Sequence, residues 1–227
     1  MGMKAKAYRL LVVAHPDDET IFFSGLLMRK RSVPWKVVCV TDGNADGRGK
    51  ERAEEFRAAT KLLGVTKAEH WDFPDRFPGR LPVDEIAARL REFSAPKEIY
   101  THGPLGEYGH PHHQDTALAV HRAFPRGAIY SPAWNSRPDR VVKMSPSEYK
   151  KKTRAFAEIY AKETHSFLNV LPNNAVETYT RFRGYEVEAL VGFLRGEREL
   201  DPKSLDRHAW MATLLPKLKE KLSVRLF

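Results

Sequence analysis

Short apolar runs alternate with longer segments along the first part of the chain. The longer segments carry apolar residues at helical spacing, and the runs have the length of buried strands. This alternation is typical of βαβ units, in which helices cover a sheet of mainly parallel strands. The predicted strands are residues 10–13, 36–41, 69–73 and 98–101, and the predicted helices are residues 20–30, 51–63, 83–93 and 114–124.

Prolines interrupt this pattern beyond residue 129. Residues 146–163 still predict a helix, because Ser145 can act as the N-cap, Pro146 as the first helical residue and Glu148 as the capping-box partner. The other elements expected here are a pair of strands within residues 176–185 and a helix from residue 205 onward.

Composition places the chain among ordinary soluble globular proteins, with 42% hydrophobic and 30% charged residues over a length of 227. No repeat or low-complexity linker divides it, so we expect one domain over residues 1–227, with a motif-bearing core at about 8–125 and a part at 126–227 that supplies substrate loops and helices. The apolar runs are too short for a membrane span or a signal peptide, which predicts a cytoplasmic location. Cys39, the single cysteine, lies in an apolar run and is expected to be a buried thiol.

The formal net charge of +9 raises the question of nucleic-acid binding. At the C-terminus lysines alternate with leucines at helical spacing, which is typical of a solvated helix face. The sequence contains no RNP, KH or helix-turn-helix signature. We therefore expect no nucleic-acid partner, and a basic nucleic-acid-binding module without catalysis stays as the alternative class.

Two loops are rich in residue types that bind metals. Residues 15–19 read His-Pro-Asp-Asp-Glu and follow the first predicted strand, and residues 108–115 contain three histidines. Loops after parallel strands meet at one edge of a sheet, so these two can converge. Two imidazoles and one carboxylate with open positions form a catalytic Zn²⁺ set with water as the remaining ligand, and the same set suits Fe²⁺. The structural alternative is a helix N-terminus, where carboxylates satisfy free N–H groups. Glu19 fits that description or, alternatively, orients a ligand histidine.

Four segments together resemble the LmbE-like, or PIG-L, family of metal-dependent de-N-acetylases. They are Ala-His-Pro-Asp-Asp-Glu at 14–19, Thr-Asp-Gly-Asn-Ala-Asp-Gly at 41–47, Arg-Ala-Glu-Glu at 52–55 through Leu-Gly-Val at 63–65, and Tyr-Gly-His-Pro-His-His at 108–113. The resemblance covers roughly the first 125 residues and implies a Rossmann-like three-layer fold. It also implies a hydrolase that removes the N-acetyl group from an amino sugar, such as N-acetylglucosamine or a conjugate. A metal-dependent amidase on a non-sugar N-acyl substrate is the alternative.

The resemblance also implies roles for residues of the first loop. His15 and Asp18 would bind zinc together with His113, and Asp17 would be the general base that takes a proton from water. Zinc lowers the pKa of a bound water from 15.7 to about 7 and polarises a carbonyl, so a nearby uncoordinated carboxylate can complete the activation. Similar enzymes often assemble through symmetric contacts, so the resemblance allows a homo-oligomer.

The remaining roles concern the oxyanion and the substrate. The resemblance implies that a protonated His110 steadies the oxyanion and can hand a proton to the leaving amine, and that Tyr108 polarises the amide carbonyl. It also implies that Arg52 reaches a sugar hydroxyl or an anionic substituent. His112 departs from the family, which more often has an acidic residue there, and we expect it to contact substrate or support a ligand, with direct metal ligation as the less favoured alternative. Trp134, in a proline-flanked loop, is a candidate substrate wall.

Overall fold

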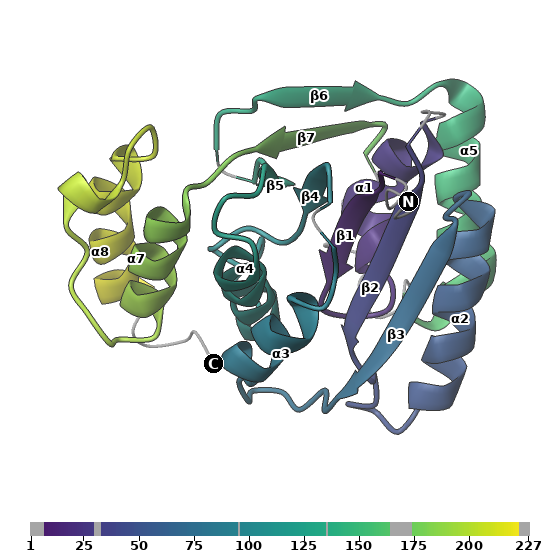
Figure 1. Cartoon of the computed structure of the whole chain (residues 1–227), viewed down its shortest axis with the longest axis horizontal. Coiled ribbons are helices and arrows are strands. Elements are labelled where there is room, and N and C mark those ends of the chain that lie inside the picture. The colour runs from purple at the N-terminus through teal and green to yellow at the C-terminus, as the bar shows by residue number, and fades with distance from the viewer. Residues whose placement is uncertain (1–6, 30–32, 95, 135, 164–173, 223–227) are drawn as a thin grey trace, which may run out of the picture.

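A seven-stranded sheet forms the centre of the protein (Figure 1). The computed structural model describes residues 7–29, 33–94, 96–134, 136–163 and 174–222, with side chains up to residue 217. The strand order is β3-β2-β1-β4-β5-β7-β6; the first five strands are mutually parallel and the last two run antiparallel to their neighbours. The prediction of a mainly parallel sheet is confirmed. The strands are β1 (Arg9–Val13), β2 (Trp35–Thr41), β3 (Lys67–Phe73), β4 (Glu98–Tyr100), β5 (Ile129–Pro132), β6 (Arg140–Lys143) and β7 (Val176–Thr180).

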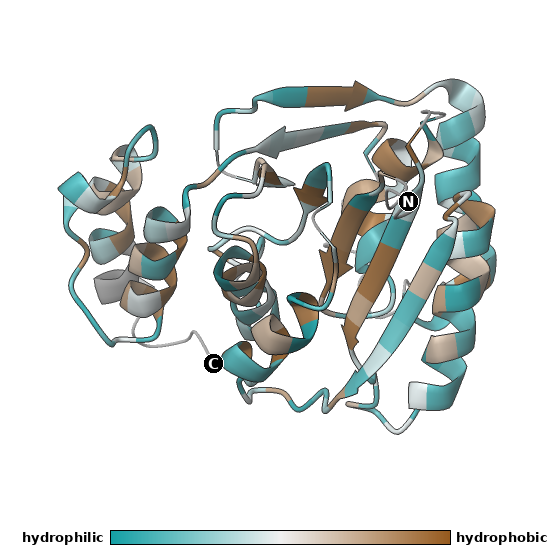
Figure 2. Cartoon of the chain, in the orientation of Figure 1, coloured by the Kyte–Doolittle hydropathy of each residue, from teal (hydrophilic) through white to brown (hydrophobic). Residues whose placement is uncertain are grey.

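Helices cover both faces of the sheet and make the three layers that the family resemblance implies (Figures 1 and 2). Alternate residues of a strand point to opposite faces. Leu10 and Val12 therefore join the apolar core under α3, α4 and α7, while Leu11 and Val13 join the core under α1, α2 and η1. The helices are α1 (Asp18–Met28), α2 (Gly49–Leu62), α3 (Val83–Leu90), α4 (Pro111–Ala123), α5 (Pro146–Arg154), α7 (Gly184–Leu194) and α8 (Trp210–Leu222), with a π-helical turn η1 (Ala155–Ile159) and a 3₁₀ turn η2 (Pro202–Ser204).

The sequence-based predictions hold best where βαβ units repeat and fail at the antiparallel edge. The predicted capping box at Ser145 is present at the start of α5, and Cys39 is a buried thiol. The predicted strand pair within 176–185 is wrong, because only β7 forms there and its partner is β6, a four-residue strand between prolines. The final helix begins at Trp210, not at residue 205. Lys30, the predicted end of the first helix, lies outside the described residues. None of the described helices combines the length and apolar character needed to cross a membrane.

A buried carboxylate ties this antiparallel edge to the first helix. Glu177 in β7 accepts hydrogen bonds from α1 at Ser24 Oγ (3.1 Å), Gly25 N (2.9 Å) and Leu26 N (3.1 Å). The Tyr179 hydroxyl adds a bond of 2.7 Å, and Nζ of fully buried Lys152 lies 3.3 Å away. The single charge of Glu177 therefore holds α1, α5 and β7 together.

We expect Glu177→Gln to lower the free energy of unfolding by about 3–5 kcal/mol, because it leaves the Lys152 ammonium buried without a counter-charge. Lys152→Met is the matched variant. It should lower the free energy of unfolding by less, because Glu177 keeps its hydrogen-bond donors on α1 and Tyr179. Denaturant unfolding measures both. Equal losses in the two variants would contradict this account.

Candidate active site

The turn between β1 and α1 separates two adjacent carboxylates. Asp17 has a φ of 116°, a region that residues with a side chain rarely occupy. The turn is held by Glu19, whose Oε2 accepts the Asp17 N–H at 3.2 Å, and by Arg52, whose Nη2 donates to the Pro16 carbonyl at 2.7 Å. Glu19 therefore satisfies a free N–H at the helix start, as its position in the sequence predicts. The result is that Asp17 and Asp18 point in different directions.

Three donor side chains converge beside this turn. His15 Nδ1 lies 3.3 Å from His113 Nε2, Asp18 Oδ2 lies 3.4 Å from His15 Nδ1, and Asp18 Oδ1 lies 3.4 Å from His113 Nε2. All three side chains are buried and form a group able to hold a metal ion. Zinc bonds of about 2.0–2.2 Å in a tetrahedral site separate neighbouring ligand atoms by roughly 3.3–3.6 Å. The spacing of this triangle, which we call the first triangle, therefore fits one small divalent ion.

Glu107 orients His113 within the first triangle, and sequence analysis missed it. Its Oε2 lies 2.7 Å from His113 Nδ1, which places the ring proton on Nδ1 and leaves Nε2 free to bind a metal. Its Oε1 accepts the Gly103 N–H at 2.7 Å. A carboxylate six residues before a candidate ligand, in the same glycine-rich loop, was the available signal.

His102 also lies beneath the first triangle. Its ring stacks on that of His113 at 3.8 Å between centroids, and its Nε2 lies 3.0 Å from the Ala14 amide. Burial disfavours a charged imidazole, but the carboxylates of Glu107 and Asp18 outweigh it and raise the pKa of His102 to about 10. His102 thus packs under the ligands and shares their counter-charges.

Asp17 and Arg52 form a buried ion pair beside the first triangle. Arg52 Nη2 lies 3.3 Å from Asp17 Oδ2. Burial raises the pKa of Asp17 well above its usual value, Arg52 opposes that rise and Asp18 adds to it. Arg52 is only 7% exposed. This placement argues against the expected contact of Arg52 with a sugar hydroxyl and makes it a residue that positions Asp17.

His110 and Tyr108 line the open side of the site. His110 is the N-cap of α4, and its Nδ1 accepts the His112 backbone N–H at 3.2 Å, ahead of Pro111 as the first helical residue. Burial and the neighbouring imidazoles of His113 and His15 lower the pKa of His110 to about 2. This environment favours a neutral ring, and an Nδ1 that accepts an N–H leaves the ring proton on Nε2. The expectation of a protonated His110 stays a prediction. Tyr108 is 53% exposed, and its ring meets that of His113 edge-on at 5.4 Å.

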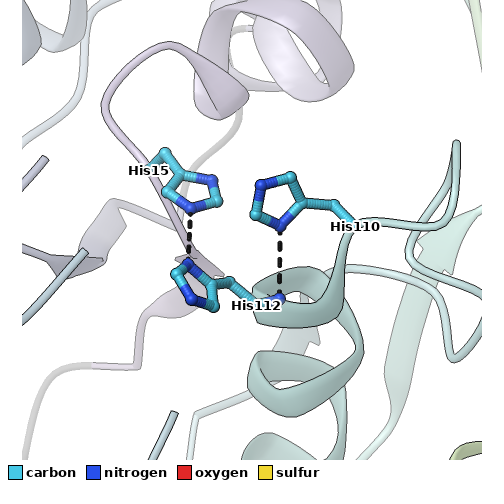
Figure 3. A group of neighbouring side chains, drawn as sticks. All are labelled: His15, His110 and His112. Atoms are coloured by element: carbon cyan, nitrogen blue, oxygen red, sulfur yellow. Dashed lines mark hydrogen bonds between the residues drawn. The ribbon is translucent and has the colours of Figure 1, made fainter. Parts of the chain in front are cut away.

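His112 lies at the base of the site and not at its mouth. Its side chain is 1% exposed, and its Nδ1 lies 3.0 Å from His15 Nε2 (Figure 3). Asp75, which follows β3 and was missed in the sequence, lies 3.3 Å from the same nitrogen. The first turn of α4 directs the ring toward His15, which favours the expected support of a ligand over the expected contact with substrate. The substrate contact stays a prediction. The rule that drew attention to the loop after β1, a carboxylate just past a strand, would also have found Asp75.

Trp134 follows β5 near the same edge. Its ring lies 6.1 Å from that of Phe22, which in turn meets His113 edge-on at 6.1 Å. Trp134 is half-buried. Its role as a substrate wall stays a prediction.

The fold and the site together define a Rossmann-like α/β protein with a buried, metal-competent His/Asp centre at the carboxyl edge of its sheet. A family model described as PIG-L, GlcNAc-PI de-N-acetylase, matches residues 10–124, which is half of the chain. The chain therefore belongs to the PIG-L family.

Individual relatives agree with this assignment. N-acetylglucosaminyl-phosphatidylinositol de-N-acetylase of Saccharomyces cerevisiae is 28% identical over 155 residues, covering 62% of this chain and 51% of its own. The structure is similar to N,N'-diacetylchitobiose deacetylase of Pyrococcus horikoshii, with a TM-score of 0.57 at 20% identity over 78% of this chain and 85% of that one. It is also similar to 4-carboxy-2-hydroxymuconate hydratase of Pseudomonas putida, with a TM-score of 0.51 at 21% identity over 77% and 95%. The chain spans about half the length of the curated relatives it matches.

The loop that carries Glu107 and Tyr108 depends on Gly106. Its φ is +70°, and a Cβ there would lie 2.4 Å from the His110 carbonyl oxygen. Gly47 has a similar φ of +83° with open space around a Cβ. We expect Gly47→Ala to cost about 1–2 kcal/mol of unfolding free energy from backbone strain alone. Gly106→Ala should cost clearly more, because the added methyl also displaces His110. Denaturant unfolding of both variants measures the difference, and equal costs would show that the loop moves freely.

Proposed function

We propose that this protein is a metal-dependent hydrolase that removes the N-acetyl group from an N-acetylglucosamine unit or conjugate. The observation that carries the proposal is the first triangle of His15, Asp18 and His113, with an uncoordinated carboxylate, Asp17, beside it. The PIG-L match and the de-N-acetylase relatives support the amide as substrate. The similar hydratase shows that the fold alone does not determine the reaction, so the proposal depends on the site residues.

In this proposal the metal is held by His15 Nδ1, Asp18 and His113 Nε2, and Zn²⁺ suits two imidazoles and one carboxylate. When bound, it would acidify a water molecule and polarise the amide carbonyl. Asp17 takes the proton from the attacking water, and Arg52 holds its carboxylate in place. The raised pKa of Asp17 suits a base that must later release the proton near neutral pH.

His110 and Tyr108 act on the carbonyl side of the amide. A neutral His110 that accepts a backbone N–H at Nδ1 presents Nε2–H as a donor, and this donor would stabilise the oxyanion of the tetrahedral intermediate. The exposed Tyr108 hydroxyl would reach the same oxygen from the opening of the site. The amine leaves with a proton that Asp17 has collected, so His110 need not be charged.

Acetate release tests this function directly. Protein loaded with Zn²⁺ or, under anaerobic conditions, with Fe²⁺ is offered N-acetylglucosamine, N,N'-diacetylchitobiose and a GlcNAc-inositol conjugate, with N-acetylated amino acids as the non-sugar comparison. We expect acetate from at least one sugar and none from the amino acids. The reverse pattern would establish the non-sugar amidase instead.

Asp17→Asn tests the base. We expect the variant to keep its metal, because Asp17 is outside the first triangle, and to lose about 10²–10⁴ in kcat. Asp46→Asn, on the exposed loop before α2, is the matched control and should retain the wild-type rate. Metal analysis and acetate release are the two measurements. Near wild-type turnover by Asp17→Asn with full metal content would exclude Asp17 as the base.

Two substitutions of His110 separate a neutral donor from a proton carrier. His110→Ala should lose about 10²–10³ in kcat, the usual cost of removing one oxyanion donor. His110→Gln places an amide N–H near the position of Nε2 but cannot carry a proton, so we expect it to recover part of that loss. A Gln variant as slow as the Ala variant would point to proton transfer by His110.

A further inference from the structure

His15 has a second ring nitrogen that the first triangle does not use. His15 Nε2 lies 3.0 Å from His112 Nδ1 and 3.6 Å from Asp75 Oδ1, and the last two atoms are 3.3 Å apart. These three atoms form a second triangle on the opposite edge of the same imidazole. All three residues are buried, with exposures of 7%, 1% and 7% for His15, His112 and Asp75.

The two triangles are nearly the same size. In the first, the two nitrogens are 3.3 Å apart and each lies 3.4 Å from the nearer Asp18 oxygen. In the second, a single Asp75 oxygen serves both nitrogens, and the sides are 3.0, 3.3 and 3.6 Å. Both offer two imidazole nitrogens and one carboxylate oxygen, the donor set that Zn²⁺ and similar divalent transition metals accept. Two sides of the second triangle, 3.3 and 3.6 Å, fall within the separation that zinc ligands need, and the third, 3.0 Å between His15 Nε2 and His112 Nδ1, would have to lengthen by about 0.3 Å on binding.

Hydrogen bonding alone does not satisfy the second triangle once a metal occupies the first. When His15 Nδ1 binds a metal, its Nε2 carries the ring proton and points at His112 Nδ1. If His112 Nδ1 is protonated in order to donate to Asp75, two N–H groups face each other. If it is unprotonated, its lone pair faces the carboxylate oxygen of Asp75. A cation among the three atoms removes this conflict, because every one of them then donates a lone pair.

His110 stands next to the second triangle. Its ring centroid lies 4.6 Å from that of His15 and 5.1 Å from that of His112, and the three residues offer nitrogens within 4.8 Å of one another (Figure 3). It can therefore act as a fourth ligand. An ion that recruits His110 would take this side chain away from the substrate.

We propose that His15 Nε2, His112 Nδ1 and Asp75 Oδ1 form a second divalent transition-metal site, with the His15 imidazole bridging the two ions. Binding of the second ion releases the Nε2 proton of His15 to solvent, and that proton returns when the ion leaves. Because the site engages His110, the second ion inhibits the enzyme. The inference rests on the proposed function only for the first ion and for this inhibition.

Metal stoichiometry tests the proposal. Metal-free full-length protein is dialysed against increasing Zn²⁺, bound metal is counted by mass spectrometry, and Co²⁺ absorption reports the coordination of each equivalent. We expect wild-type protein to bind two ions, the second more weakly. His112→Asn should lose the second ion and keep the first. Asp18→Asn should lose the first and keep the second, and His15→Asn should lose both.

His112→Asn and Asp18→Asn are expected to lose different ions. This difference separates the loss of one site from misfolding, because a misfolded variant would lose both ions. The ratio of acetate release at excess zinc to that at one equivalent should fall in wild-type protein and stay near one in His112→Asn. A single ion in wild-type protein, or two ions in His112→Asn, would overturn the second site and leave an orienting hydrogen bond only. Two ions without any deacetylation would instead refute the proposed function and preserve this site.

Discussion

The abrupt turn from β1 into α1 is the constraint on which the whole site depends. A φ of 116° at Asp17 is costly for a residue with a side chain, and it persists because Glu19 and Arg52 hold the backbone on both sides. The turn lets two successive carboxylates serve different purposes. Asp18 turns inward to the histidines, and Asp17 stays beside Arg52. A relaxed helical start at this point would direct both side chains along one helix and merge their roles.

The buried histidines of the site share carboxylates as polar partners, and these contacts offset the cost of burying the imidazoles. Asp18 lies near His15, His102 and His113, and Glu107 contacts the latter two. Burial disfavours a charged His15, but Asp18 and Asp75 on its two edges outweigh burial and raise its pKa to about 9. Burial by itself would raise the pKa of Asp18, but His113 and His102 outweigh burial and hold that pKa well below its usual value. Metal binding must therefore displace protons from an already balanced network, which couples affinity to pH.

The sequence predicted the parts of the molecule that obey a repeating rule. Buried parallel strands are continuous apolar runs, so β1, β2 and their helices could be read with small errors at the ends. β6 could not, because a four-residue strand with one buried side leaves no periodic signal and depends on pairing with β7. In the site, the residues of the first triangle follow from the resemblance of two loops to the PIG-L motifs. The orientations of His112 and Arg52 do not, since they depend on which partner, Asp75 or Asp17, the folded chain brings within reach.

His112 changes how the site is connected to the rest of the fold. An acidic residue at this position would face His15 with its own charge, whereas the His112 imidazole brings no carboxylate. Asp75, 3.3 Å from His112 Nδ1, supplies one, and so the loop after β3 becomes part of the site. The same loop is anchored a few residues later, where the carboxylate of Asp115 in α4 accepts the Arg80 guanidinium and the Leu81 N–H. Two contacts thus fix the loop after β3 to α4, one at His112 and one at Asp115. The position of His15 Nε2 is then set by three separate segments, which is the preorganisation that a bridging imidazole requires.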